Sequence, residues 1–192
     1  WAANYRKLRQ KFLSATGAEI SQGMRLLLKV AVNFSEAYGL KLIVHDIDPS
    51  YSLGEMERQR KETIERLSRE GVIDRNKQLP LGLPQRLAVI SSGTAAGYGD
   101  FIDQLDKNRY GYLFFHKLYS AVMQGAESAE SVASALNDIE LSGQSYDAVI
   151  IIRGGGSVAD LSCFDSYEMA KAVALFSIPV ITGIGHDKDK SV

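Results

Sequence analysis

An arginine followed by three glycines and a serine, from Arg153 to Ser157, is the stretch of this sequence best suited to chemistry. Glycines allow a sharp turn and let a phosphate approach bare backbone N–H groups. The guanidinium adds a planar fork that forms two parallel hydrogen bonds with a phosphate. We therefore interpret the stretch as an anion-binding turn, in preference to a tight turn with a solvated arginine. It matches neither the dinucleotide pattern G-x-G-x-x-G nor a P-loop, which needs Lys-Ser/Thr after its glycines.

A second polar group, near the C-terminus, contains a histidine and two carboxylates, His186, Asp187 and Asp189. Histidine is the side chain best suited to proton transfer near neutral pH, and an aspartate can orient it or hold a divalent cation. An isolated histidine is more often structural, so a chemical role for His186 depends on its sharing one edge of the fold with Arg153.

The hydrophobic pattern predicts the elements that position these groups. Short apolar runs predict strands over 87–90, 112–115, 147–152 and 178–182, and helical periodicity predicts helices over 100–108, 128–139 and 162–176. This alternation predicts right-handed crossovers. The fold class is therefore α/β, with a doubly wound, mostly parallel sheet and helices on both of its faces.

Ligands of such sheets bind beyond the carboxyl ends of the strands. Three predicted strands end in polar or glycine-rich loops, which we expect at one edge of the sheet. The candidate phosphate-binding residues are Ser91, Ser92 and Thr94 after the first strand, and Gly154, Gly155, Gly156 and Ser157 after the third. Asp100 is predicted to open the helix after the first loop. An acid there is either catalytic or favoured by the helix dipole alone.

The residues before this alternation predict a different unit. A polar helix over 4–14 precedes two apolar runs, 24–34 and 40–48, which predict a β-hairpin. Two strands are not stable alone, so we expect further strands before Trp1 or support from the segments after the hairpin. Pro49 and Ser50 mark a boundary. A charged helix over 55–70 and an irregular linker over 76–84 then lead into the α/β part.

The composition excludes several classes of protein. The chain has 192 residues, 45% hydrophobic and 23% charged, which is typical of a globular protein. No apolar run approaches the ~20 residues of a membrane-spanning helix, and no signal peptide is evident. The single cysteine, Cys163, excludes an intrachain disulfide and predicts a reducing compartment, which we take to be the cytoplasm. Because the sequence starts with Trp1, we expect it to be a piece of a longer protein.

The net charge of −1 predicts no global attraction to nucleic acid, but the charge is unevenly distributed. Residues 1–30 contain a single acid, Glu19, and six basic residues: Arg6, Lys7, Arg9, Lys11, Arg25 and Lys29. Such a segment either holds a polyanion or is a solvated helix face. From the residues alone, the phosphate-binding edge fits phosphodiester hydrolysis, or a nucleotide or sugar-phosphate enzyme.

Several motifs, spaced in the same order, resemble the exodeoxyribonuclease VII large-subunit family. They are Arg-Gly-Gly-Gly-Ser-Val-Ala-Asp-Leu at 153–161, Phe164, and Ile-Pro-Val-Ile-Thr-Gly-Ile-Gly-His at 178–186. The resemblance continues through Arg-Leu-Ala-Val-Ile-Ser-Ser at 86–92 and Gln-Gly at 124–125. The residues at 48–54 are similar to the family's junction between an OB-fold and the catalytic core.

The resemblance implies an exonuclease that degrades single-stranded DNA from either end to oligonucleotides and works with a small helical subunit. It implies that residues 1–49 are the C-terminal part of an OB-fold that binds single-stranded DNA. Residues 50–192 are then an α/β nuclease core, truncated before the region that binds the small subunit. In the OB-fold part, Tyr5 and Phe34 are either stacking residues or core residues. A second interpretation is a fragment that binds single-stranded DNA or nucleotides without turnover.

The family's functional positions fall on four residues: Asp100, Arg153, His186 and Asp189. Arg153 and the amides of residues 154–156 are expected to hold the scissile phosphate, with His186 as general acid or base. Asp100 and Asp189 are expected to orient His186 or bind a metal ion. The resemblance leaves the cofactor Mg²⁺ open.

The sequence departs from the family pattern without losing any of these four groups. Asp187 stands where a glutamate is usual, Gly93 where a proline is usual, and Ala159 where an acid is common. The acidic residue after Phe164 is displaced to Glu168.

Overall fold

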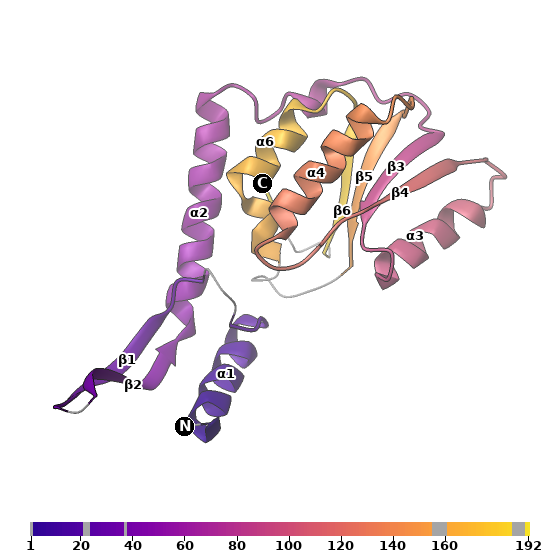
Figure 1. The fold of residues 1–192 in the computed structure, drawn as a ribbon. Helices are drawn as coiled ribbons and strands as arrows, with labels where there is room; N and C mark the ends of the chain where they lie inside the picture. The colour runs from indigo at the N-terminus through magenta and orange to yellow at the C-terminus, as the bar shows by residue number, and fades with distance from the viewer. Residues whose placement is uncertain (1, 21–23, 37, 155–160, 186–190) are drawn as a thin grey trace.

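The computed structural model describes residues 2–20, 24–36, 38–154, 161–185 and 191–192. Figure 1 shows an N-terminal helix and hairpin that the long helix α2 joins to an α/β unit. The first part contains α1 (Ala2–Thr16), β1 (Leu27–Ser35), β2 (Gly39–Asp48) and α2 (Pro49–Arg69). The α/β unit contains the short helix η1 (Asn76–Gln78), β3 (Arg86–Ser91), α3 (Ala96–Asp106), β4 (Phe115–Ser120), α4 (Ser128–Leu141), β5 (Ala148–Arg153), η2 (Ser162–Asp165), α6 (Tyr167–Leu175) and β6 (Val180–Ile184).

The strands of the α/β unit form a four-stranded sheet in the order β4-β3-β5-β6, and every neighbouring pair is parallel. Their carboxyl ends therefore lie at one edge. All six residues of β5 are buried, because strands flank it on both sides and helices cover both faces. The predicted fold class, α/β with a parallel sheet and helices on both faces, is confirmed.

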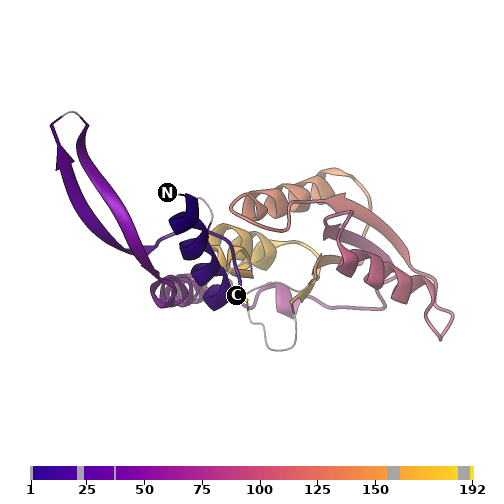
Figure 2. The ribbon, with the colours of Figure 1, turned by 90° about the horizontal axis from the view of Figure 1, so that it is seen from below.

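The two faces of the sheet carry separate cores. On one face, α4 and α6 cover residues such as Ile90 and Ile151, and Phe164 packs with them. On the other face, α3 covers the residues that alternate with these, such as Val89 and Ile150. Figure 2 shows α4 and α6 on one side of the sheet and α3 on the other. Because successive side chains of a strand point to opposite faces of the sheet, the position of each residue at the end of β5 determines the face on which its side chain lies.

Helix α2 begins earlier than predicted, and for a local reason. Asp48 caps it by accepting a hydrogen bond from the Ser50 amide at 3.0 Å, and Pro49 occupies its first turn. The proline that we interpreted as a break is thus a helix start. The predicted end is confirmed, because Gly71, with φ of 68°, follows the last turn.

Three further boundaries differ from the prediction. Strand β4 spans Phe115–Ser120, so it shares only Phe115 with the predicted strand 112–115, and residues 112–114 precede it. The predicted helix 162–176 is interrupted at Ser166, whose side chain accepts a hydrogen bond from the Met169 amide and so starts α6. Helix α3 begins at Ala96, so Asp100 lies in its second turn and does not open it.

Buried polar contacts fix the connections around the sheet. Asn76 is buried, donates to the carbonyls of Phe176 and Ile178, and accepts from the amide of Val180 at 2.8 Å. It thereby holds the start of β6. Thr63 of α2 donates to the Asp165 carbonyl at 2.9 Å, which ties α2 to η2.

The hairpin of β1 and β2 projects away from the α/β unit in both views (Figures 1 and 2). Its strands pair antiparallel, with an irregularity between Lys29 and Val30. Large apolar side chains are exposed on it, including Val32, Phe34, Leu40 and Leu42. Among the helices that the structure describes, none combines the length and the apolar character needed to cross a lipid bilayer.

Candidate functional site

The carboxyl edge of the sheet brings together residues that are far apart in the sequence. The loop after β3, the end of β5 and the end of β6 meet there, as predicted for the described parts of the three loops. The Gly185 amide donates to the carbonyl of Arg153 at 3.4 Å, and Arg153 is in register with Ile184. The glycine-rich ends of β5 and β6 are therefore neighbours.

Arg153 is the last residue of β5 and is almost completely buried, with 4% of its surface exposed. It alternates with Ile152, so it belongs to the face covered by α4 and α6. Burial raises the pKa of the Cys163 thiol, while a hydrogen bond with Ser128 and the positive charge of Arg153 partly oppose the rise. The guanidinium thus lies near the start of α4 and η2. A guanidinium removed from bulk water attracts a phosphate more strongly than a surface arginine does.

The backbone after Arg153 is approached closely by the start of α3. A Cβ placed on Gly97 would lie 3.1 Å from both the Cα and the N of Gly154. Only a glycine at position 97 leaves this approach undisturbed. Our sequence reasoning missed Gly97. The small residues Ala95, Ala96 and Gly97 after a strand were the available signal, but they do not reveal their partner.

The three hydroxyl residues predicted to bind phosphate take different positions. Ser91 is fully buried, and its hydroxyl donates to the Ile152 carbonyl at 2.8 Å, so it braces β3 against β5 and does not face the edge. Ser92 and Thr94 do reach the edge. Their hydroxyls lie 3.2 Å apart.

A cavity of about 750 Å³ opens at this edge. Arg153, Gly154, Ser92 and Thr94 line it, together with the start of α3, the loop after β4 and Ser131 of α4. Of the predicted phosphate-binding residues that the structure describes, all but Ser91 are thus gathered around one cavity. Its volume lies within the usual range for small-molecule sites.

Of the other predicted site residues, Asp100 alone has a described position, and it lies outside this cavity. Asp100 is exposed on α3, one turn beyond Gly97, and is not among the residues that line the cavity. Gly155, Gly156, Ser157, His186 and Asp189 lie outside the described residues. Within the described ranges, no group of three or more His, Cys, Asp or Glu side chains is arranged to hold a metal ion. Asp100 is therefore the one predicted metal ligand with a described position.

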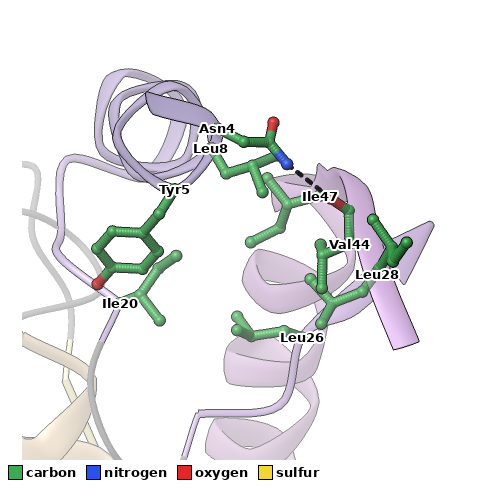
Figure 3. A pocket seen from close by; sticks show the side chains of 9 residues that line it. Asn4, Tyr5, Leu8, Ile20, Leu26, Leu28, Val44 and Ile47 are labelled. Carbon is green, nitrogen blue, oxygen red and sulfur yellow. Dashed lines mark hydrogen bonds between the residues drawn. The ribbon is translucent and has the colours of Figure 1, made fainter. Parts of the chain in front are cut away.

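A smaller, apolar cavity of about 200 Å³ lies between α1 and the hairpin. Figure 3 shows Tyr5 and Leu8 of α1 facing it, opposite Val44 and Ile47 of β2. The side-chain amide of Asn4 donates a hydrogen bond to the backbone carbonyl of Val44 at 2.8 Å, which fixes α1 on the strand. Both predicted stacking residues are accessible to solvent: Tyr5, which lines this cavity, is half exposed, and Phe34, which does not line it, is exposed on the hairpin.

The basic segment at the N-terminus is partly neutralised in the fold. Ion pairs join Arg9 to Glu19, Lys11 to Asp46 and Arg25 to Glu55; the hydrogen bond from Lys11 contributes most to lowering the pKa of Asp46. The other three basic residues, Arg6, Lys7 and Lys29, form no ion pair with a described residue.

The fold and the edge together define an α/β protein with a candidate anion site at the carboxyl ends of its strands. A family model described as "Exonuclease VII, large subunit" matches residues 72–192. The chain is 37% identical to the exodeoxyribonuclease 7 large subunit of Deinococcus radiodurans, over all of this chain and 47% of that protein. It is 44% identical to the corresponding protein of Nostoc sp., over 66% of this chain and 30% of the relative.

A third relative, the exodeoxyribonuclease 7 large subunit of Lacticaseibacillus casei, is 35% identical over 91% of this chain and 38% of its own length. The chain therefore belongs to the exonuclease VII large-subunit family, as its motifs indicated. It spans less than half the length of these curated relatives.

Proposed function

We propose that this chain is the segment of an exodeoxyribonuclease that binds single-stranded DNA and hydrolyses its phosphodiester bonds, from either end, to oligonucleotides. The observation that supports this most directly is the buried Arg153 in the wall of the cavity at the carboxyl edge. Arg153 and the Gly154 amide hold the scissile phosphate and stabilise its developing charge. Family membership supports the reaction class.

The remaining roles in this proposal belong to residues predicted from the sequence. His186 acts as general acid or base, and Asp189 orients it or binds a metal ion. Asp100, which is exposed in the second turn of α3, takes part in the same roles. Mg²⁺, if it is used, supplies charge stabilisation at the phosphate, with Asp100 and Asp189 as its candidate ligands.

We also propose partners and an organisation for the longer protein. Residues 1–49 form the last part of an OB-fold, whose exposed Tyr5 and Phe34 stack on DNA bases. Residues 50–192 form most of the nuclease core. The enzyme acts in the cytoplasm with a small helical subunit that binds outside this segment.

The test uses the full-length protein assembled with its small subunit and a single-stranded oligonucleotide labelled at either end. Arg153→Ala is expected to lower kcat by about 10³-fold, because oxyanion contacts of this kind contribute on the order of 3–4 kcal/mol. Arg153→Lys keeps the positive charge but lacks the planar fork, so its kcat is expected to lie between those of Arg153→Ala and the wild type. Parallel reactions with magnesium and with a chelator determine the metal requirement.

The matched control is Arg109→Ala, which removes an exposed arginine that does not line the cavity. Its turnover is expected to equal that of the wild type. Near-normal turnover of a folded Arg153→Ala enzyme would refute the assignment.

A second candidate function is binding of single-stranded DNA without turnover by this segment alone. Salt-sensitive binding by residues 1–192 that Arg153→Ala weakens, without cleavage products, would support it.

A further inference from the structure

The cavity beside Arg153 extends across three neighbouring strand ends. It begins at the end of β5, passes the loop after β3 and reaches residues 120–124 after β4. Since β3 lies between β4 and β5, the two ends of the cavity are about two strand spacings apart, roughly 10 Å. A nucleotide bridges such a span from its phosphate to its base.

Among the described residues that line the cavity, the charge is concentrated at one end. Among the described residues that line it, Arg153 is the only one with a charged side chain. The others are small or apolar residues, hydroxyl residues and one amide. This distribution suits a ligand with a single anionic group attached to a neutral body.

The end formed by the loop after β4 is an apolar shelf with a polar rim. Ala121 and Met123 are buried there, and Val122 is exposed. The Ala121 amide donates to the Ser91 carbonyl at 3.0 Å, and the Val122 amide donates to the Ser131 hydroxyl at 2.9 Å. These hydrogen bonds hold the shelf on β3 and α4, so it is preorganised.

We infer that this shelf is a nucleoside subsite, which holds the sugar and base of the nucleotide whose phosphate contacts Arg153. The face of the base lies against the exposed side chain of Val122, and the exposed side-chain amide of Gln124 contacts its edge. An amide both donates and accepts hydrogen bonds, and an apolar contact does not distinguish one base face from another, so the subsite accepts all four bases. The inference rests on the proposed function and specifies how that site positions its substrate.

The test compares a single-stranded oligonucleotide with one that carries a single abasic residue at an internal position. The full-length enzyme assembled with its small subunit is used, and each product end is mapped. An abasic residue keeps the phosphate but removes the base from the shelf. We expect the bonds next to it to be cut about tenfold more slowly than the same bonds in the intact strand.

Gln124→Ala locates the effect. This variant is expected to cleave the intact strand more slowly. The ratio of the cleavage rates of the intact and abasic strands is expected to be smaller than in the wild type, because the variant has already lost part of the contact with the base. Gln104→Ala removes an exposed glutamine of α3 that does not line the cavity. It is expected to show the same ratio of cleavage rates for the intact and abasic strands as the wild type.

Equal cleavage rates beside normal and abasic residues would refute the nucleoside subsite and leave the proposed nuclease activity unaffected. An unchanged difference in Gln124→Ala would overturn the contact assigned to that amide. If the wild-type enzyme failed to cut the intact strand, the proposed function would be wrong and the inference would fall with it.

Discussion

Arg153 is positioned by residues that themselves carry no chemistry. The hydroxyl of Ser91 donates to the Ile152 carbonyl immediately before it, and Gly97 lies against Gly154 immediately after it. The end of β5 is thus held from both sides. The arginine and its glycines were predictable because their types and order are local in the sequence. Their supports were not, because those contacts join residues more than fifty positions apart.

Gly97→Ala is predicted to impair activity more than stability. The added methyl would meet the backbone of Gly154, which must shift by a few tenths of an ångström and carry the phosphate-binding turn with it. A displacement of this kind in a catalytic constellation lowers kcat, and we expect a loss of about tenfold or more. Steady-state kinetics of the full-length enzyme, beside its thermal unfolding, measures both effects.

Gly99→Ala is the matched control, since a Cβ at Gly99 of the same helix would meet nothing within 4 Å. It is expected to raise stability by about 0.5–1 kcal/mol through helix propensity and to leave kcat unchanged. Equal kinetics for the two alanine variants would show that the contact between Gly97 and Gly154 does not position the site.

At the scale of elements, the sequence predicted which segments are helices and strands better than it predicted where they begin. The number of strands in the α/β unit, their parallel direction and the covering of both faces followed from the spacing of apolar runs, whereas the strand order β4-β3-β5-β6 was not predicted. The start of α2 at Pro49 and the break at Ser166 depend on single capping hydrogen bonds. Such contacts compete with a periodic pattern that continues through them, so the pattern alone misplaces the boundary.

The junction between α2 and η2 contains a carboxyl group that makes stability depend on pH. Burial raises the pKa of Asp165 to about 6, although the Val192 amide and Arg60 partly oppose the shift. The unfolded value is about 4. A carboxyl group with a raised folded pKa adds stability that is fully present below pH ~4 and is lost as the pH rises through ~6.

Asp165→Asn is therefore predicted to remove a decrease in stability between about pH 4 and pH 6 and to make the chain more stable than the wild type above that range. The shift corresponds to at most about 3 kcal/mol, which solvent screening reduces to about 1–2 kcal/mol. Urea unfolding of residues 1–192 at several pH values measures the effect. Asp138→Asn on the exposed face of α4 controls for the lost charge. Parallel curves for wild type and Asp165→Asn across this range would contradict the prediction.

At the scale of the whole molecule, the two parts of the chain differ in how well they bury apolar surface. The α/β unit has a core on each face of its sheet. The hairpin instead exposes large apolar residues, of which Phe34 is 69% exposed. A two-stranded sheet is marginal in water unless further strands or a packed helix support it. The hairpin is therefore expected to depend on neighbouring protein for its stability, which agrees with the proposal that it belongs to an OB-fold.

This difference predicts that the chain can be divided at the start of α2. A fragment of residues 48–192 keeps Asp48 as the cap of α2 and contains both cores. We expect it to unfold cooperatively, with a Tm within a few degrees of that of residues 1–192. The fragment loses the contacts of α2 with α1 and β1, among them the hydrogen bond from Ser52 to the Arg25 carbonyl and the ion pair between Arg25 and Glu55. Residues 1–48 alone are expected to lack cooperative unfolding.

Calorimetry and circular dichroism of the two fragments make the comparison, and DNA binding adds a second readout. Loss of the basic segment is expected to weaken binding of a single-stranded oligonucleotide and to reduce the slope of log K against log salt concentration. Each phosphate contact that is lost lowers this slope by about 0.7. Since half of the six basic residues are already paired with acids, the slope should fall by about two and not by about four. A fragment 48–192 without a cooperative transition would show that the hairpin and the α/β unit fold as one body, and the boundary at Pro49 would then have to be abandoned.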